Sequence, residues 1–291
     1  MYKIVTHSGS FHPDDVFAVA SFQLLLGVEN IEIIRTRDES IITEGDYVVD
    51  VGGVYDHDAK RYDHHQNGAP VRENGIPYAG FGLMWRHYSE EICQSAEIAQ
   101  AIENRLVQPI DAGDNGVKLF DVNQYEVHPF ELYHLVSLYS PAWGSGGNKD
   151  EAFLKAVDWA RSVIIRIIEK ERANLELKQL IKETYEAAEE KQILVFDVSV
   201  PMPALIEYSD VELVVCPDDP QSNNNWMTTC VRKNNDTFES RVIFPESWAG
   251  LRGEELQKVS GIHDAVFCHK ARFLVVTESK ESALKVAELA E

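Results

Sequence analysis

The chain has 291 residues, and its 48 Asp and Glu against 27 Lys and Arg give a formal net charge of −21. This acidity excludes a simple basic protein that binds nucleic acid through Lys and Arg contacts to phosphate, but not an enzyme whose metal ions supply positive charge. With 44% hydrophobic and 26% charged residues, the composition is that of a soluble globular protein, and the length favours two domains.

Cysteine usage and the N-terminal sequence indicate the cell compartment. The four cysteines are far apart and form no CxxC pair, which favours reduced thiols over a disulfide framework or a zinc–cysteine site. The N-terminus lacks the basic and apolar regions of a signal peptide. No apolar run approaches the roughly 20 residues of a membrane span. We therefore expect a cytoplasmic protein without a membrane partner.

The first half of the chain alternates short β-branched segments with helical ones. Strands are expected at residues 3–6, 31–34 and 47–51. A helix is expected at residues 13–26, with proline in its first turn and acidic residues near its positive end. This alternation predicts an α/β domain with a doubly wound, mainly parallel sheet.

Residues 149–192 contain neither Gly nor Pro and show a helical period of apolar positions over much of their length. They predict a long helical segment that closes the first domain, either continuous or broken near residues 172–174. A coiled-coil dimerisation arm is the alternative, which the irregular a/d spacing disfavours. A homodimer is compatible with the sequence but is not required by it.

Strands dominate the remainder of the chain. They are expected at residues 193–198, 211–216, 227–233, 265–269 and 273–278, followed by a helix at 281–289. Consecutive strands with few helices predict a smaller α+β domain with a mixed or antiparallel sheet. We place the two domains at residues 1–190 and 191–291.

Histidines and aspartates are concentrated at the start of the chain. Five of the ten histidines lie within the first 65 residues. His7 follows the first expected strand, Asp50 lies at the end of the third, and His64 comes in the next connection. Ligand sites in open parallel sheets form beyond the carboxyl ends of strands, so these groups should converge. Imidazole and carboxylate suit Mn²⁺, Fe²⁺, Co²⁺ or Zn²⁺, with Mn²⁺ favoured by the carboxylate share.

Several motifs occur in the same order as in a known family. They are His7-Ser-Gly-Ser-Phe-His12-Pro-Asp14, the segments at residues 49–56 and 61–66, Asp111-Ala-Gly-Asp114, and the stretches at residues 244–252 and 261–269. Together they resemble the MYG family, a branch of the DHH phosphoesterases, whose name matches Asp63-His64-His65. The resemblance covers nearly the whole chain.

The resemblance implies a dinuclear Mn²⁺-type centre. One ion would be held by His7, His12 and Asp50, and the other by Asp14, Asp50, His64 and Asp114. His12 stands where the wider superfamily has an aspartate. Two choices stay open: Asp15 competes with Asp14, although we favour helix capping for Asp15, and Asp111 competes with Asp114.

Further residues take roles by the same resemblance. His65 would face the substrate phosphate and Asp63 would orient a histidine, so these two residues are the expected catalytic pair. Arg252 and His269, in the second domain, are candidates for substrate binding.

The implied function is a metal-dependent phosphodiesterase. A 3′→5′ exonuclease acting on short single-stranded RNA or oligonucleotides, through a hydroxide activated by two metal ions, is the leading hypothesis. The first alternative is a hydrolase of a small phosphate compound such as pyrophosphate, polyphosphate or a cyclic dinucleotide. The second is a non-catalytic, metal-binding regulatory protein.

Overall fold

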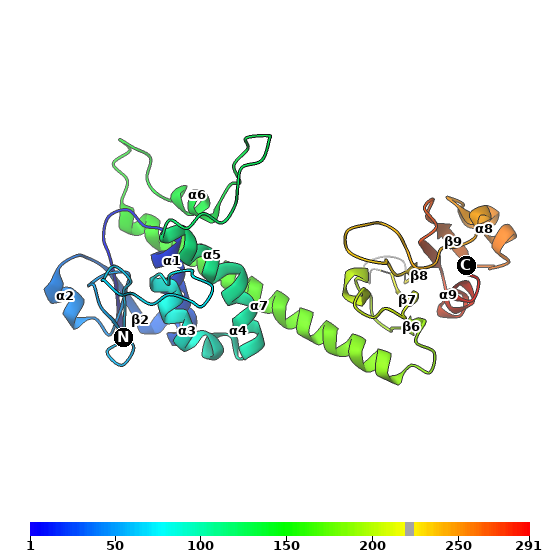
Figure 1. The fold of residues 1–291 in the computed structure, drawn as a ribbon, viewed down its shortest axis with the longest axis horizontal. Helices are drawn as coiled ribbons and strands as arrows, with labels where there is room; N and C mark the ends of the chain where they lie inside the picture. The colour runs from blue at the N-terminus through cyan, green and yellow to red at the C-terminus, as the bar shows by residue number, and fades with distance from the viewer. Residues whose placement is uncertain (219–223) are drawn as a thin grey trace. The chain divides into compact units, whose positions relative to one another are not determined.

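The computed structural model describes residues 1–218 and 224–291, which form two compact units, Met1–Arg172 and Ala173–Glu291. The division lies inside helix α7 (Lys149–Ala187), whereas the sequence placed it near residue 190. The reason is that the end of α7 belongs to the second core, where Ile181 is buried among the side chains of the second sheet. Figure 1 shows the elements of both units.

The first unit is built on a five-stranded sheet with the order β2-β1-β3-β5-β4. The pairs β1–β2, β1–β3 and β3–β5 are parallel, and only the edge strand β4 is antiparallel. The predicted α/β fold with a mainly parallel sheet is therefore confirmed. The strands are β1 (Tyr2–Thr6), β2 (Ile31–Arg35), β3 (Tyr47–Val49), β4 (Tyr55–Asp56) and β5 (Arg61–Tyr62).

Strand β3 ends earlier than the sequence predicted. Pairing stops at Val49 instead of Val51, because Asp50 adopts a positive φ of 55° that turns the chain out of the strand. Aspartate is one of the few side chains that enter this left-handed region readily. The Asp50 N–H still donates to the Tyr62 carbonyl oxygen at 3.1 Å, which holds the turn against β5.

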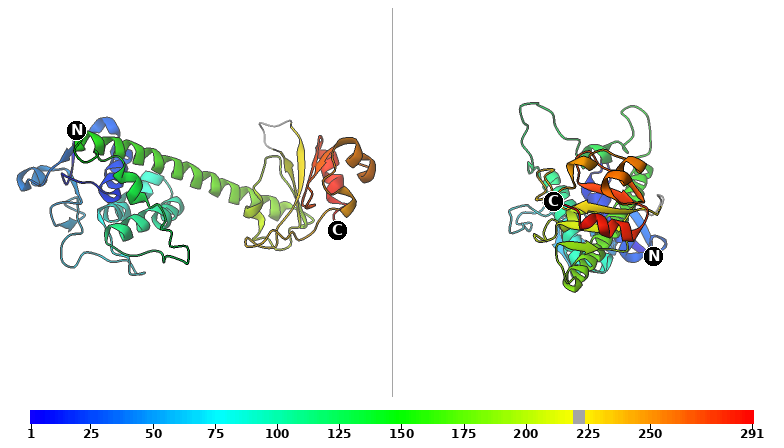
Figure 2. Two further views of the ribbon diagram at one scale, coloured as in Figure 1. Left: turned by 90° about the horizontal axis from the view of Figure 1, so that it is seen from above. Right: turned by 90° about the vertical axis from the view of Figure 1, so that its right-hand side faces the viewer.

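Helices cover both faces of this sheet (Figure 2). Val5, Val48 and Val51 pack with Ile42 of the short helix α2 on one face. Helices α1 and α3, which pack on each other, lie over the other face. Every residue from Pro13 to Gln23 of α1 is buried, as a central helix requires. The helices and helical turns are α1 (Pro13–Leu26), η1 (Val28–Asn30), α2 (Glu39–Glu44), α3 (Gly80–Cys93), α4 (Ala96–Ile102), π-helical η2 (Glu103–Val107), α5 (Gln108–Asp114) and α6 (Leu132–Ser137).

Helix α7 is continuous, without the break that the sequence allowed near residues 172–174. Its early apolar residues, including Phe153, Val157 and Ile164, are fully buried. Further along, Ile181 is 1% exposed in the core of the second unit. These four apolar positions of the helix are thus buried within this chain and are not free to form a coiled-coil arm.

The second unit contains a five-stranded sheet with the order β6-β7-β8-β10-β9. Only β6 and β7 are parallel, and the other pairs are antiparallel, as expected for the smaller α+β domain. Helix α9 packs on β7, β8 and β10 (Figure 2). The elements are β6 (Ile193–Val195), η3 (Met202–Leu205), β7 (Leu213–Pro217), β8 (Trp226–Cys230), η4 (Glu246–Trp248), α8 (Gly253–Ser260), β9 (Ala265–Cys268), β10 (Leu274–Thr277) and α9 (Lys280–Ala287).

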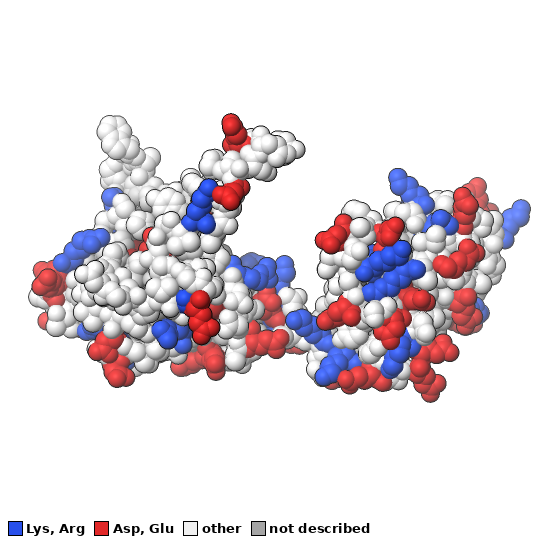
Figure 3. Space-filling view, in the orientation of Figure 1, with Lys and Arg blue, Asp and Glu red and all other residues white. Residues whose placement is uncertain are grey.

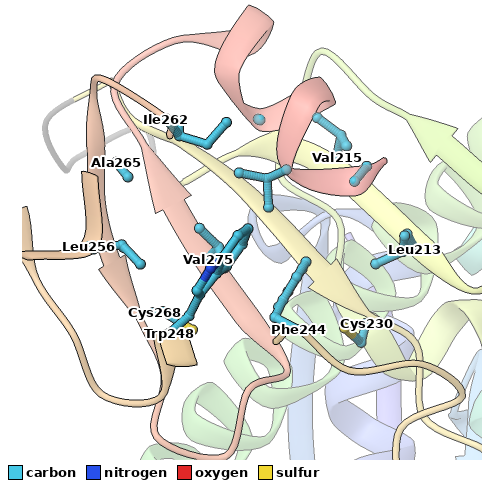
Figure 4. Packing of buried hydrophobic residues seen from close by; sticks show 13 residues of the cluster. Leu213, Val215, Cys230, Phe244, Trp248, Leu256, Ile262, Ala265, Cys268 and Val275 are labelled. Carbon is cyan, nitrogen blue, oxygen red and sulfur yellow. The ribbon is translucent and has the colours of Figure 1, made fainter. Parts of the chain in front are cut away.

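Strand β7 is apolar throughout because both of its faces are covered. Leu213 and Val215 point into a cluster that includes Trp248 and Val275 (Figure 4). Val214 and the alternate positions of the strand belong to a separate cluster with the end of α7. Since successive side chains of a strand point to opposite faces, an uninterrupted apolar run is needed here.

Helix α9 begins at an N-cap serine, and this contact can be tested. The Ser279 Oγ accepts the backbone N–H of Ser282 at 3.2 Å. We expect Ser279→Ala to destabilise the second unit by about 1 kcal/mol, because one helix N–H loses its acceptor. Hydrogen exchange of the α9 amides is the measurement, with the exposed Ser199→Ala as control. Equal protection in the two variants would contradict the capping role.

All four cysteines are free and buried. Among the described residues, no helix has the length and apolar character needed to cross a membrane.

Candidate metal centre

The predicted ligands are brought to one edge of the first sheet. His7 follows β1, Asp50 follows β3, and Asp63 begins the segment after β5. These three strands are parallel, so their carboxyl ends lie at the same edge. Three groups of possible ligand atoms occur there, each with all its atoms within 4.8 Å of one another. One group, Asp50, Asp63, His64 and His65, shares a member with each of the other two, which are described first.

The first group consists of His7, Asp15 and Asp50. The His7 Nε2 lies 3.2 Å from the Asp15 Oδ2 and 3.3 Å from the Asp50 Oδ2. All three residues are buried. One imidazole nitrogen and two carboxylate oxygens therefore converge on a space away from bulk water.

The second group consists of Asp14, His64 and Asp114. The His64 Nε2 lies 3.2 Å from the Asp114 Oδ2. Asp14 is held in place by the N-terminus of α3, where its carboxylate accepts the Phe81 N–H at 2.6 Å and the Gly80 N–H at 3.1 Å. This group brings together three of the four residues that the resemblance assigned to one ion.

Asp50 contacts both groups. Its Oδ2 faces His7, while its Oδ1 lies 3.4 Å from the His64 Nε2. The left-handed backbone conformation of Asp50 presents the carboxylate at this position. A carboxylate with its two oxygens directed to different imidazoles is placed as a bridging ligand would be.

His12 lies at the margin of the cluster. It is the N-cap residue of α1, with a side chain that is 41% exposed. The His12 Nδ1 lies 3.8 Å from the Asp114 Oδ1, and the rings of His12 and His7 are 6.1 Å apart. The structure thus places Asp15, and not His12, beside His7 and Asp50.

Asp15 has two roles, of which the sequence indicated one. Its Oδ1 accepts the backbone N–H groups of His12 at 2.8 Å and Val16 at 3.0 Å, which is the predicted capping. Its Oδ2 faces His7. Two adjacent aspartates after a histidine-containing turn were the signal, but only the fold shows that both are directed at the cluster.

Asp111 is occupied elsewhere. Its Oδ2 pairs with the Arg72 Nη2 at 2.6 Å, and its Oδ1 accepts the Gly82 N–H at 3.1 Å. Gly82 is required there, because a Cβ at that position would lie 1.8 Å from the Asp111 Oδ2. Of the two aspartates that the sequence left open, Asp114 is the one that faces the cluster.

Asp63 positions the exposed His65. The Asp63 Oδ1 accepts the His65 Nδ1–H at 2.7 Å, and the Oδ2 accepts the Gly53 N–H at 2.6 Å. Asp63 is 2% exposed, whereas the His65 side chain is 63% exposed. A buried carboxylate thus fixes one ring nitrogen of His65 and leaves the other free.

The pKa values of the clustered residues show that positive charge is stabilised among them. Burial lowers the pKa of His7, but Asp15 and Asp50 outweigh this effect and raise it to about 10. For His64, burial is outweighed by Asp114 and Asp50, and the pKa rises to about 11. Burial raises the pKa of Asp50, but His64 and His7 hold it at about 2. Burial, followed by the Asp50 and Asp114 charges, raises the pKa of Asp14 well above its ordinary range.

Three buried atoms test whether these residues suit a metal ion. The Asp15 Oδ2, Asp50 Oδ1 and His64 Nε2 have no hydrogen-bond partner among the described residues. Buried polar atoms without a partner are costly unless a ligand satisfies them. Carboxylate and imidazole donors suit a divalent transition metal, so the residues fit such an ion.

Arg252 and His269 lie in the second unit. The Arg252 guanidinium stacks on the Phe267 ring at 4.1 Å. The His269 Nδ1 accepts the Ala271 N–H at 3.1 Å, and its ring lies 6.2 Å from that of Phe267. The two predicted substrate-binding residues thus flank one aromatic side chain of β9, and their role stays a prediction.

Charge is dispersed on the face of each unit that Figure 3 presents. Figure 3 shows acidic and basic side chains interspersed over the presented face of each unit. The net charge of −21 is therefore not gathered into one acidic patch on that face.

An α/β fold with clustered carboxylates and imidazoles at the carboxyl edge of a parallel sheet defines a class of protein with a site suited to divalent metal ions. The chain belongs to the MYG1 family: residues 3–290 match the model MYG1_exonuc, described as Uncharacterised protein family (UPF0160). The predicted family is confirmed, and its placement among the DHH phosphoesterases stays a prediction.

Several proteins are similar over nearly the whole chain. The MYG1 protein of Chlamydia pneumoniae is 32% identical over 293 residues, covering 99% of this chain and 96% of that protein. The MYG1 exonuclease of Rattus norvegicus is 29% identical over 321 residues, covering 98% and 83%. A solved structure, the pGpG-specific phosphodiesterase PggH from Vibrio cholerae, matches with 16% identity and a TM-score of 0.36, covering 99% of this chain and 97% of that one.

Proposed function

We propose that this protein is a metal-dependent phosphodiesterase, acting as a 3′→5′ exonuclease on short single-stranded RNA or oligonucleotides. The observation that carries the proposal is the position of Asp50, whose carboxylate joins two groups of possible ligand atoms. The names of the relatives from Bos taurus and Rattus norvegicus, both MYG1 exonuclease, support the nuclease activity.

Two Mn²⁺ ions are assigned to the two groups that contain His7 and Asp114. His7, Asp15 and Asp50 would hold one ion, with His12 as a further candidate at the margin. Asp14, His64 and Asp114 would hold the other, with Asp50 shared. Such ions lower the pKa of bound water and neutralise charge on a phosphate.

The role of the protein side chains beyond the ligands is to position the phosphate. His65 is exposed beside the cluster, with its Nδ1 hydrogen-bonded to Asp63. The free Nε2 would donate to a non-bridging phosphate oxygen when the ring is protonated. Negative charge on that oxygen increases during attack on phosphorus, so a fixed donor there favours the transition state.

The acidic surface favours a short substrate. A net charge of −21 repels the backbone of a long nucleic acid, whose affinity depends on many cationic contacts. A short single strand needs few such contacts and can be held by the centre itself. This is the reason for proposing oligonucleotides and not duplexes.

The test is hydrolysis of labelled oligonucleotides of two to ten nucleotides by Mn²⁺-loaded protein. We expect nucleoside monophosphates to be released from the 3′ end, which 5′-labelled substrates show as a ladder. Intact oligonucleotides would overturn the nuclease proposal, and a parallel panel of pyrophosphate, polyphosphate and cyclic dinucleotides would then identify a small-phosphate hydrolase. Elemental analysis of the same protein measures the metal content.

His65→Ala separates substrate positioning from metal binding. We expect kcat to fall by roughly 10²- to 10⁴-fold, in the range of a lost acid–base or hydrogen-bonding group, while the metal content is unchanged. His128→Ala, at an exposed histidine of the same unit, is the matched control and should keep full activity. Loss of metal together with activity in His65→Ala would make His65 a ligand instead.

A further inference from the structure

A cavity of about 670 Å³ opens beside the metal centre, within the first unit. His12 and Asp114 line it, and Asp114 also belongs to the metal centre. Its volume falls within the roughly 300–1,000 Å³ of small-molecule sites. A group that is covalently attached to a phosphate at the centre can therefore reach this cavity.

The walls of the cavity are mainly apolar and include aromatic rings. Leu106, Ile110 and Leu132 contribute aliphatic surface, and Phe120 and Tyr133 contribute rings. The Tyr133 ring lies 6.0 Å from the His12 ring, tilted by 39°, and the residue is 53% exposed. An accessible aromatic face next to the centre is suited to stacking with a planar group.

The cations at the cavity are already paired. Arg105 binds Glu171 at 2.6 Å, and Lys118 binds Asp121 at 2.9 Å. Glu131, which also lines the cavity, adds negative charge. The cavity is therefore built for an uncharged, planar group and not for a second phosphate.

We propose that this cavity is a nucleobase subsite, in which the base attached to the phosphate at the metal centre stacks on Tyr133. The inference rests on the proposed function and adds the part of the substrate that the centre itself does not contact. It also explains how an acidic protein retains a nucleotide, because stacking does not depend on phosphate-binding cations.

The surrounding segment supports this occupant. Exposed apolar side chains recur from Leu119 to Trp143, on α6 and on the two loops that flank it. In Figure 1 these loops project from the first unit, and in Figure 3 they show mostly uncharged side chains. This surface includes the walls of the cavity. The cavity in turn adjoins the metal centre, because its lining includes His12 and Asp114. That continuity favours the substrate over a protein partner.

The first test measures binding without turnover. The probe is a dinucleotide with a phosphorothioate linkage and 2-aminopurine as the 3′ base, whose fluorescence falls on stacking. We expect Tyr133→Ala to bind it roughly 5- to 150-fold more weakly, the range of one lost base–aromatic stack. Tyr125→Ala is the matched control, because Tyr125 is exposed in the same segment but does not line this cavity.

A second variant fills the cavity without removing a wall. Gly113 lines it and lies within α5, and an added Cβ would meet open space beyond the backbone of its own helix. Gly113→Leu should weaken binding of the probe at least tenfold, whereas Gly113→Ala should bind it as the wild type does. Both variants should keep the wild-type metal content.

The substrate comparison separates the two proposals. For a dinucleotide whose 3′ nucleotide is abasic, Tyr133→Ala and Gly113→Leu should retain the wild-type kcat/KM, while for the intact dinucleotide their KM rises. Wild-type protein that hydrolyses neither substrate overturns the proposed function but not the subsite, which the binding measurement still tests. Probe binding that is unchanged in both Tyr133→Ala and Gly113→Leu overturns the subsite. If the loops then bind a second copy of the protein, this surface is an interface between copies and not a substrate site.

Discussion

Asp50→Asn is expected to abolish hydrolysis, with kcat/KM lowered by at least about 10³-fold, and to reduce the bound metal. A single lost transition-state donor costs enzymes about 10²- to 10³-fold. The loss of activity in Asp50→Asn should be larger than this, because the Asp50 carboxylate faces both His7 and His64. An amide offers one neutral oxygen where the carboxylate offers two that share a negative charge, so the residue can no longer serve both groups of ligands.

Asparagine is the informative replacement for Asp50, because it tolerates the left-handed backbone conformation at this position. Asp50 has a φ of 55°, a conformation that Asn adopts at least as readily as Asp, whereas Ala would add strain. Metal content is measured by elemental analysis and kcat/KM on a labelled dinucleotide, with the exposed Asp58→Asn as control. Full metal content and activity in Asp50→Asn would refute the shared-ligand assignment and the dinuclear centre with it.

The location of the metal centre could be predicted from the sequence because it depends on topology. Parallel strands place their carboxyl ends at one edge, so His7, Asp50 and the residues after β5 had to meet once the strands were recognised. The end of β3 could not be predicted in the same way. Val49 and Val51 both fit a strand pattern, and only the left-handed turn at Asp50 between them ends the pairing.

Other features depend on contacts between distant segments. The pattern of residues 149–192 predicts a helix, but not that Ile181 is buried in the second unit. Asp111 and Asp114 are indistinguishable as ligands in sequence, since both lie on α5. Arg72, 39 residues before Asp111, is what separates them, and a lone arginine in a polar loop carries no signal for that role.

Arg72→Ala is expected to destabilise the first unit by about 3–5 kcal/mol, the cost of leaving a buried charge without its partner. The Arg72 side chain is 6% exposed and binds Asp111 at 2.6 Å and Glu103 at 2.7 Å, and its guanidinium also lies 3.8 Å from the Tyr78 ring centroid. Denaturant unfolding is the measurement. Lys3→Ala, which removes an exposed pair with Glu44 in the same unit, should cost less than about 1 kcal/mol.

The same substitution should weaken metal binding from a distance. Asp111 anchors α5 to α3 through Gly82, and Asp114 is the last residue of α5, so an unpaired Asp111 displaces a ligand. We expect the double variant Arg72→Ala, Asp111→Ala to be less destabilised than the sum of the single variants, since both remove one contact. Mn²⁺ should raise the unfolding midpoint of Arg72→Ala less than that of the wild type, because a ligand of the native state stabilises it in proportion to its affinity. Additive free energies would show that Arg72 and Asp111 do not act as one contact. A Mn²⁺-induced rise equal to that of the wild type would show that the buried pair and the metal centre are independent.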